Sequence, residues 1–235
     1  MGQKGAEMGV TQLSEGLKLN KTTVYRLLNA MEKFEVIEKS PESDRYRLGL
    51  KLHELGAKAV ESRTLRSEAH RFLERLAHES HEAASLAVPG TTGIVCLDRV
   101  DSSQTVISFR TPAGAKFPAH CTAAGKAVLA YLPENEIDAI LAANGLPRFT
   151  SSTITRASKL KSQLRQIVKR GYALDNQELE RGLIGIAAPI WGRDGEIVGA
   201  LGMAGPSTRF RGGELAKKIA LTVEIAGKIG ASLGH

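Results

Sequence analysis

Hydrogen-bonding side chains crowd one short stretch near the N-terminus, between residues 21 and 29. The apolar residues Val24, Leu27, Leu28 and Met31 fall at i, i+3, i+4 and i+7, which predicts one buried stripe on a helix. The first two turns of that helix then present hydroxyl, amide and guanidinium groups to solvent, as a helix that reads base edges does. We predict DNA contacts from Lys21, Thr22, Thr23, Tyr25, Arg26 and Asn29.

A second, shorter helix is predicted to support this one. Asn20 is a good N-cap for the polar helix, while Thr11 can cap a helix that carries Leu13 and Leu17 one turn apart. Residues 18–20 have about the right length for the turn between two such helices. The pattern is that of a helix-turn-helix.

A two-stranded wing is predicted next. Residues 36–40 and 45–48 are β-type runs, separated by turn-forming residues at 41–44. If Tyr46 and Leu48 face inward, Arg45 and Arg47 alternate outward, where they can meet DNA phosphates. The alternative is an ordinary helical hairpin with a solvated polar face, but that face carries hydroxyl, amide and Arg groups rather than Glu/Lys pairs.

Charge alone does not locate the DNA site. The chain has a net charge of +7, but residues 1–50 hold eight Lys/Arg against seven Asp/Glu, a net of only +1. No apolar run approaches the roughly 18 residues of a membrane helix, and the start of the chain does not resemble a signal peptide. Two cysteines do not make a disulfide scaffold. We expect a cytoplasmic protein with no membrane partner.

The rest of the chain predicts a second domain of different texture. Helical spacing runs over 48–60 and 65–76, with a break near 62–65, and is followed by short β runs at 85–89, 93–100 and 105–110. Further helices are predicted at about 122–132, 134–144 and 157–170, and strands at 172–175, 184–191 and 196–204, the last two joined by a turn at 192–195. Hairpin-linked strands with helices on their faces predict an α/β domain with a mostly antiparallel sheet. The final helix, at 214–233, carries Leu215, Ile219, Val223 and Ala226 on one face.

The sequence motifs give little support for a nucleotide-binding, metal-binding or catalytic site. The run Ala124-Gly125-Lys126 resembles part of a phosphate loop, but His120 and Ala127 stand where that loop needs Gly and Ser/Thr. His120 and Cys121 have no CxxC or HxxxH partners for a metal, and adjacent residues rarely aim their side chains at each other as nucleophile and base. We expect no enzyme, no metal and no cofactor.

The helix predicted after Thr122 offers a site for an anion. Its small-residue sequence leaves the first backbone N–H groups unpaired at the positive end of the helix dipole, where a carboxylate can bind. The expected ligand is an organic acid whose anionic end lies near Thr122, Ala123 and Ala124. His120 is a further candidate partner for this carboxylate, and so is Arg110 if its strand faces the ligand pocket. A solvated Arg110 is the alternative.

These features together resemble the IclR family of transcriptional regulators. KTTVYRLL and RYRLGLKLHELG match the family's recognition helix, wing and linker, and HCTAAGKAVLA, LDNQELERGLIGIAAPI and GALGMAGP match its effector-binding domain. The resemblance implies an α+β chain, with a winged helix-turn-helix at 1–49, a linker helix at 50–64 and a GAF-like effector-binding domain at 65–235. It also implies a homodimer or dimer of dimers that binds a double-stranded DNA operator and responds to a small organic acid.

Carried over residue by residue, the family's pocket falls on small and polar side chains. Relatives hold a small acid with Cys or Ser where this chain has Gly185, Gly202 and Ala204, which indicates a roomier pocket for an aromatic acid or a sugar acid. The alternative is that glycines in a strand merely permit close packing. Asp175 is interpreted as a pocket or turn residue. The implied effector-binding positions are Gly114, Ala115, His120, Thr122, Asp175, Gly185, Gly202 and Ala204.

Two further expectations concern the N-terminal half. Family members begin with a full helix before the one at Thr11, but the three glycines in residues 1–10 disfavour such a helix here. A misplaced start or a truncated chain is favoured over a defective DNA-binding module. A homodimer is also expected, because one recognition helix reads few base pairs and the apolar stripes over 52–76 exceed the needs of a linker. The competing function is a small-molecule-binding or catalytic α/β protein with a vestigial DNA-binding module.

Overall fold

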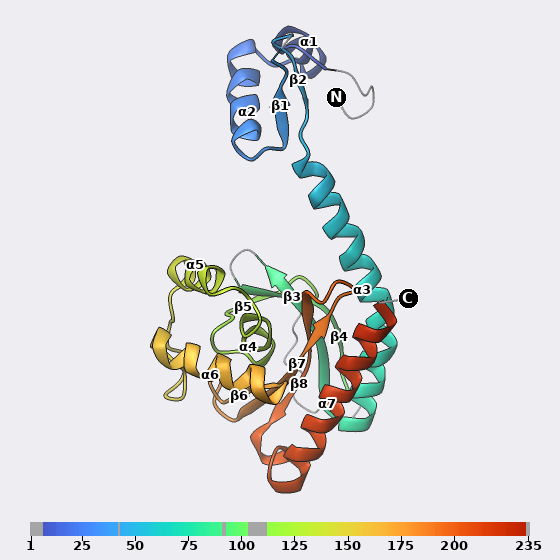
Figure 1. Ribbon diagram of the computed structural model, residues 1–235, viewed down its shortest axis with the longest axis vertical. Helices are drawn as coiled ribbons and strands as arrows, with labels where there is room; N and C mark the ends of the chain where they lie inside the picture. The colour runs from blue at the N-terminus through green and yellow to red at the C-terminus, as the bar shows by residue number, and fades with distance from the viewer. Residues whose placement is uncertain (1–6, 42, 91–92, 103–111, 234–235) are drawn as a thin grey trace. The chain divides into compact units, whose positions relative to one another are not determined.

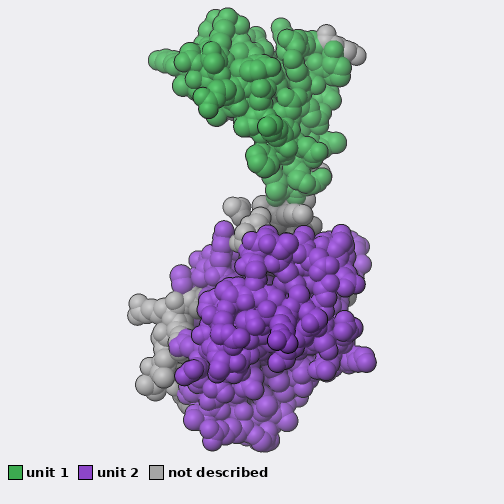
Figure 2. Space-filling model, turned by 90° about the vertical axis from the view of Figure 1, so that its left-hand side faces the viewer, with its two compact units in different colours: residues 1–63 green, residues 64–235 purple. Residues whose placement is uncertain are grey.

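The computed structural model describes residues 7–41, 43–90, 93–102 and 112–233. The chain forms two compact units, Met1–Arg63 and Thr64–His235, which Figure 2 colours green and purple. Across the described residues, no helix has both the length and the apolarity needed to cross a bilayer.

The N-terminal unit is the predicted helix-turn-helix with its wing. Helices α1 (Val10–Leu17) and α2 (Lys21–Lys33) precede strands β1 (Ile37–Lys39) and β2 (Tyr46–Leu48), which pair antiparallel (Figure 1). The Asn20 side chain caps α2 as predicted, accepting the Thr23 N–H at 2.7 Å. The cap of α1 was wrongly predicted: Thr11 lies inside that helix, and the chain enters it at Gly9, whose N–H donates to the Gln12 side chain at 3.1 Å.

The core of this unit is smaller than the sequence pattern indicates. Val24 and Leu28 are buried with Ile37 and Tyr46. The other apolar residues predicted to face inward are exposed, namely Leu27 (48%), Met31 (42%) and Leu48 (48%). The wing strands have three residues each, so they cover only the narrow stripe of α2 that Val24 and Leu28 form at positions i and i+4.

Helix α3 (Lys51–Ser80) is one continuous helix of 30 residues, so the predicted break near 62–65 is wrong. Its later turns bury Leu65, Ala69, Leu73 and Leu76 in the core of the C-terminal unit. This part of the apolar surface, which was expected to support dimerisation, is therefore buried within the chain itself.

A six-stranded antiparallel sheet organises the C-terminal unit, with strand order β5-β4-β3-β8-β7-β6. The antiparallel prediction is confirmed, and the predicted strand at 105–110 lies outside the described residues. The strands are β3 (Ala83–Gly90), β4 (Gly93–Val100), β5 (Lys116–Phe117), β6 (Ala173–Asn176), β7 (Leu183–Trp191) and β8 (Ile197–Pro206).

Helices cover both faces of this sheet. Helix α7 (Gly212–Leu233) lies beside α3 on one face (Figure 1), and Arg75 of α3 forms an ion pair with Glu224 of α7 at 3.3 Å. Helices α4 (Ala123–Leu129) and α6 (Ala157–Arg170) lie on the other face, together with α5 (Glu134–Asn144). A short 3-10 helix, Ser207–Arg209, precedes α7.

The buried face of α7 differs from the predicted one. Val223 is exposed and Leu215 and Ile219 are only partly buried, whereas Lys218 and Thr222 are buried. Burial of Lys218 is possible because its ammonium group donates to the Ser80 carbonyl at 2.7 Å and to the Glu82 carboxylate at 2.9 Å.

Candidate DNA interface and ligand cavity

The exposed surface of α2 carries most of the predicted DNA-contacting residues. Lys21, Thr22, Tyr25 and Arg26 are exposed, whereas Thr23 and Asn29 are half-buried beside them. Val24 and Leu28 fix this orientation by packing against the wing. The N-terminal turns of α2 therefore present cationic, hydroxyl and aromatic groups together.

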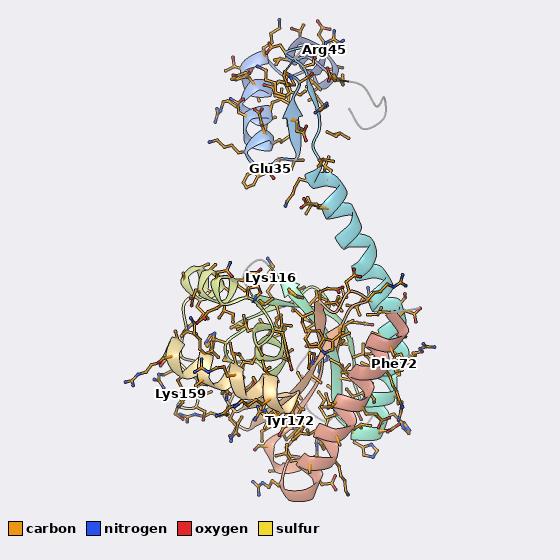
Figure 3. All side chains as sticks on the ribbon, in the orientation of Figure 1. Glu35, Arg45, Phe72, Lys116, Lys159 and Tyr172 are labelled. Atoms are coloured by element: carbon orange, nitrogen blue, oxygen red, sulfur yellow. The ribbon has the colours of Figure 1, made fainter. Side chains whose placement is uncertain are left out.

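The two wing arginines differ in their surroundings. Arg45, labelled in Figure 3, immediately precedes β2, and no ion-pair partner of it is found among the described residues. Arg47 instead donates from Nε and Nη2 to Glu38 at 3.2 and 3.0 Å, and this hydrogen bond lowers the pKa of the Glu38 carboxyl. Both arginines are exposed, so the Arg47 pair is weak and open to exchange for a phosphate.

A cavity of about 200 Å³ lies between the sheet and the N-terminal end of α4. Its volume suits a small organic molecule rather than a drug-sized one. The sheet contributes small side chains such as Ala83, Ala87 and Ala204, and α4 contributes Ala123 and Ala124. Polar lining comes from Ser85, Arg99, Thr122, Asp175 and Glu180.

Six of the ten predicted effector-binding residues line this cavity, and three of the others do not. The six are Thr122, Ala123, Asp175, Gly185, Gly202 and Ala204. Gly114 and Ala115 instead pair with β4, exchanging backbone hydrogen bonds with Cys96 at 2.7 and 2.9 Å. His120 lies in a separate cavity, its Nε2 3.0 Å from the Pro147 carbonyl, and burial lowers its pKa. Arg110 lies outside the described residues.

The two strand glycines in the lining have different physical roles. A Cβ on Gly202 would lie 2.8 Å from the carbonyl oxygen of Ile186, so close packing of β7 against β8 already requires glycine there. A Cβ on Gly185 would find its nearest neighbour, the Ala123 Cβ, at 3.4 Å. Close packing of the strands thus explains the glycine at position 202, whereas the glycine at position 185 adds space to the cavity.

Thr122 and Gly125 hold the start of α4 in place. The Thr122 hydroxyl accepts the Gly125 N–H at 3.2 Å and donates to the Pro118 carbonyl at 2.8 Å. The N–H groups of Ala123 and Ala124, at the first helical positions, have no acceptor within the helix. Both residues line the cavity.

A buried ionic cluster stands behind the wall of the cavity. Lys126 from α4 pairs with Glu178, and the Asp175 carboxylate accepts the Glu178 N–H at 2.7 Å. Burial raises the pKa of Asp175 to about 6 and lowers that of Lys126. Burial also raises the pKa of the Cys121 thiol to about 12, so this thiol is protonated at neutral pH and unsuited to nucleophilic attack.

Arg99, Ser85 and Cys96 also line the cavity, and sequence reasoning missed them. Arg99 and Ser85 are direct partners across β3 and β4, which places both on one face of the sheet. The sequence feature that could have indicated Arg99 is its position as a cation within the mostly apolar run 93–100. The guanidinium donates from Nε and Nη2 to Asp101 at 2.8 and 2.6 Å.

Comparison with known proteins covers nearly the whole chain. The sequence pattern described as the bacterial transcriptional regulator IclR C-terminal domain matches residues 57–231, and that of the IclR helix-turn-helix domain matches residues 1–41. The regulator KdgR of Escherichia coli is 33% identical over 229 residues, which cover 97% of this chain and 87% of KdgR.

Two solved structures extend the similarity to the fold. The IclR protein of Thermotoga maritima has 28% identity and a TM-score of 0.70, covering 98% of this chain and 92% of that one. An inducer-binding domain of PobR from Acinetobacter, solved as a double mutant with 3-hydroxybenzoic acid, has 26% identity and a TM-score of 0.64. That match covers 71% of this chain and 97% of the PobR domain.

Proposed function

The chain belongs to the IclR family of bacterial transcriptional regulators, and we propose that it binds its operator through α2 and the wing and is controlled by an organic acid bound in the cavity. The observation that carries the DNA assignment is the exposed cluster on the first turns of α2, held outward by buried Val24 and Leu28. Arg26 is the proposed base-reading residue, because a guanidinium bonds a guanine edge through two N–H groups. Lys21, Thr22, Thr23, Tyr25 and Asn29 complete the contact surface of α2.

The wing residues Arg45 and Arg47 are proposed to contact phosphates. Arg45 is open to such a contact, whereas Arg47 must exchange Glu38 for a phosphate. Phosphate contacts contribute affinity and salt dependence but little sequence preference.

The proposed effector is a small organic acid. Support comes from the free N–H groups at the start of α4 beside the cavity, and from the related PobR domain, whose structure holds 3-hydroxybenzoic acid. The residues assigned to it are the six predicted ones that line the cavity, Thr122, Ala123, Asp175, Gly185, Gly202 and Ala204, together with Ser85 and Arg99. Gly114, Ala115, His120 and Arg110 are left out of the assignment.

The remaining proposals concern the oligomeric state, the domain limits and the cellular location. A homodimer is proposed, because two recognition helices supply the specificity that one lacks and because exposed apolar side chains, Leu27, Met31 and Phe34 among them, lie on the N-terminal unit. Domain limits are proposed at 1–49, 50–64 and 65–235. The relatives are named as regulators, which supports a non-enzymatic protein that acts on the chromosome in the bacterial cytoplasm.

The DNA assignment is tested with an operator selected from random DNA by the purified protein. Arg26→Ala should lose roughly 1–3 kcal/mol of preference for that operator over random DNA. Lys33→Ala, at the other end of α2, is the matched control and should retain the preference. Equal losses on operator and random DNA for Arg26→Ala would remove Arg26 from the base-reading role.

The regulatory assignment uses the same operator with 3-hydroxybenzoate and a panel of aromatic and sugar acids. An effector must change operator affinity, because it acts only by binding two conformations unequally. A panel that leaves operator affinity unchanged throughout would contradict control by an organic acid of these classes.

A further inference from the structure

A β-bulge in β4 changes which side chains face the cavity. Ala87 pairs with Cys96 and Leu86 pairs with Asp98, so Leu97 has no partner on β3. Ile94 and Cys96 line the cavity before the bulge, and Arg99 lines it afterwards. Simple alternation from Cys96 would have put residue 98 in the cavity. The bulge instead places Arg99 there and turns Asp98 to the opposite face.

On that opposite face, Asp98 contacts helix α3. Its carboxylate lies 2.7 Å from Nδ1 of His70 and 3.6 Å from Nη2 of Arg66. It also accepts the backbone N–H of Arg99 at 3.0 Å. The Asp98 side chain is 7% exposed, so this is a buried carboxylate held between β4 and α3. Neighbouring residues of one strand thus face the cavity and the helix.

Arg99 is the only cation among the described residues that line the cavity. Two of its N–H groups bond one oxygen of Asp101, whose side chain is 47% exposed. A guanidinium has five N–H groups, so Arg99 retains donors for a ligand. A carboxylate with a buried apolar body can compete with the half-exposed Asp101 for the same guanidinium.

We propose that Arg99 binds the carboxylate of the acid in exchange for Asp101, and that Asp98 transmits the resulting movement of β4 to α3. The regulatory meaning rests on the proposed function, because α3 continues to Lys51 in the N-terminal unit. Arg99 determines the specificity for an acid, and Asp98 with His70 positions the helix.

The specificity step is tested by calorimetric titration of the full chain with benzoate and with its neutral analogue benzamide. Arg99→Gln should weaken benzoate binding about tenfold, the loss of a charge-assisted bond, and leave benzamide binding unchanged. Asp101→Asn should strengthen benzoate binding, an effect that mere disruption of the site would not produce. Arg193→Gln, in an exposed turn, is the control.

Three results would overturn this step. They are no benzoate binding by the wild type, wild-type benzoate affinity in Arg99→Gln, or weaker benzoate binding in Asp101→Asn. None of the three depends on DNA.

The transmission step is tested by hydrogen exchange over residues 64–73 of α3, with and without saturating benzoate. Benzoate should alter exchange in the wild type and in the control His78→Gln, but not in Asp98→Asn. His70→Gln breaks the same contact from a side chain that is 51% exposed, so it remains informative if Asp98→Asn fails to fold. A benzoate response in His70→Gln equal to that of the wild type would overturn the role of the contact.

Operator binding is measured separately on the same variants. If benzoate alters exchange in α3 through Asp98 but no acid changes operator affinity, the proposed function fails while the contact-based transmission stands. If acids change operator affinity equally in the wild type and His70→Gln, the proposed function stands and the transmission fails.

Discussion

Replacing Asp175 by Asn tests the electrostatics of the cavity wall. Burial raises the pKa of the Asp175 carboxyl from 3.8 to about 6. Since one pKa unit corresponds to about 1.4 kcal/mol, ionising this buried group lowers the free energy of unfolding by roughly 3 kcal/mol at most. Asparagine keeps an oxygen to accept the Glu178 N–H and carries no charge.

The pH dependence of the Asp175→Asn effect follows from the upward shift of the Asp175 pKa. The stability contributed by protonated Asp175 is complete below its unfolded pKa of 3.8 and is lost as the pH rises through about 6. Asp175→Asn should therefore gain stability relative to the wild type, by roughly 2 kcal/mol more at pH 7 than at pH 4. His120 has the opposite slope, because its lowered pKa removes stability as the pH falls.

The assay is urea denaturation of wild type and variant at several pH values from 4 to 7. His120 lies close to the cluster in both proteins, so its titration largely cancels in the difference. Asp194→Asn, in an exposed turn, is the matched control and should show a flat difference. A difference for Asp175→Asn that stays constant to about 0.5 kcal/mol over this range would refute the reasoning.

Two more predictions concern the buried ion pair and the glycines of the cavity wall. Lys126→Met should lower the free energy of unfolding by about 3–5 kcal/mol, because it leaves the buried Glu178 carboxylate without its cation. Adding Glu178→Gln should recover much of this loss in the same denaturation assay. Gly202→Ala should lower the free energy of unfolding by about 1–3 kcal/mol, because its Cβ would meet the Ile186 carbonyl at 2.8 Å. Gly185→Ala should leave the free energy of unfolding unchanged and weaken 3-hydroxybenzoate binding in a titration.

Local sequence signals account for much of the observed fold. Helix α6 has the predicted limits because Leu160, Leu164 and Ile167 give it a buried face and Gly171 ends it in a left-handed conformation. The antiparallel strands β7 and β8 follow from the turn chemistry at 192–195 between two β runs. Such signals act over a few residues, so the sequence displays them directly.

Long-range pairing is what the sequence conceals. The buried face of α7 includes Lys218, and its contacts with Ser80 and Glu82, more than a hundred residues away in the chain, make that burial favourable. A hydrophobic period alone therefore selects Val223, which is exposed, and Leu215 and Ile219, which are only partly buried. The burial of Leu65, Ala69 and Leu73 of α3 in the core of the C-terminal unit likewise depends on residues distant in the chain.

The cavity shows how one backbone irregularity redirects a site. The family resemblance indicated Thr122, Asp175, Gly185, Gly202 and Ala204, which do line it. Arg99 could not be placed from the strand period, because strict alternation after Ile94 and Cys96 puts Arg99 on the face covered by α3 and α7. Only the unpaired Leu97 brings this cation into the cavity, and the same residue directs the carboxylate of Asp98 to α3. A bulge that sets both orientations at once is therefore the feature on which acid recognition and its transmission jointly depend.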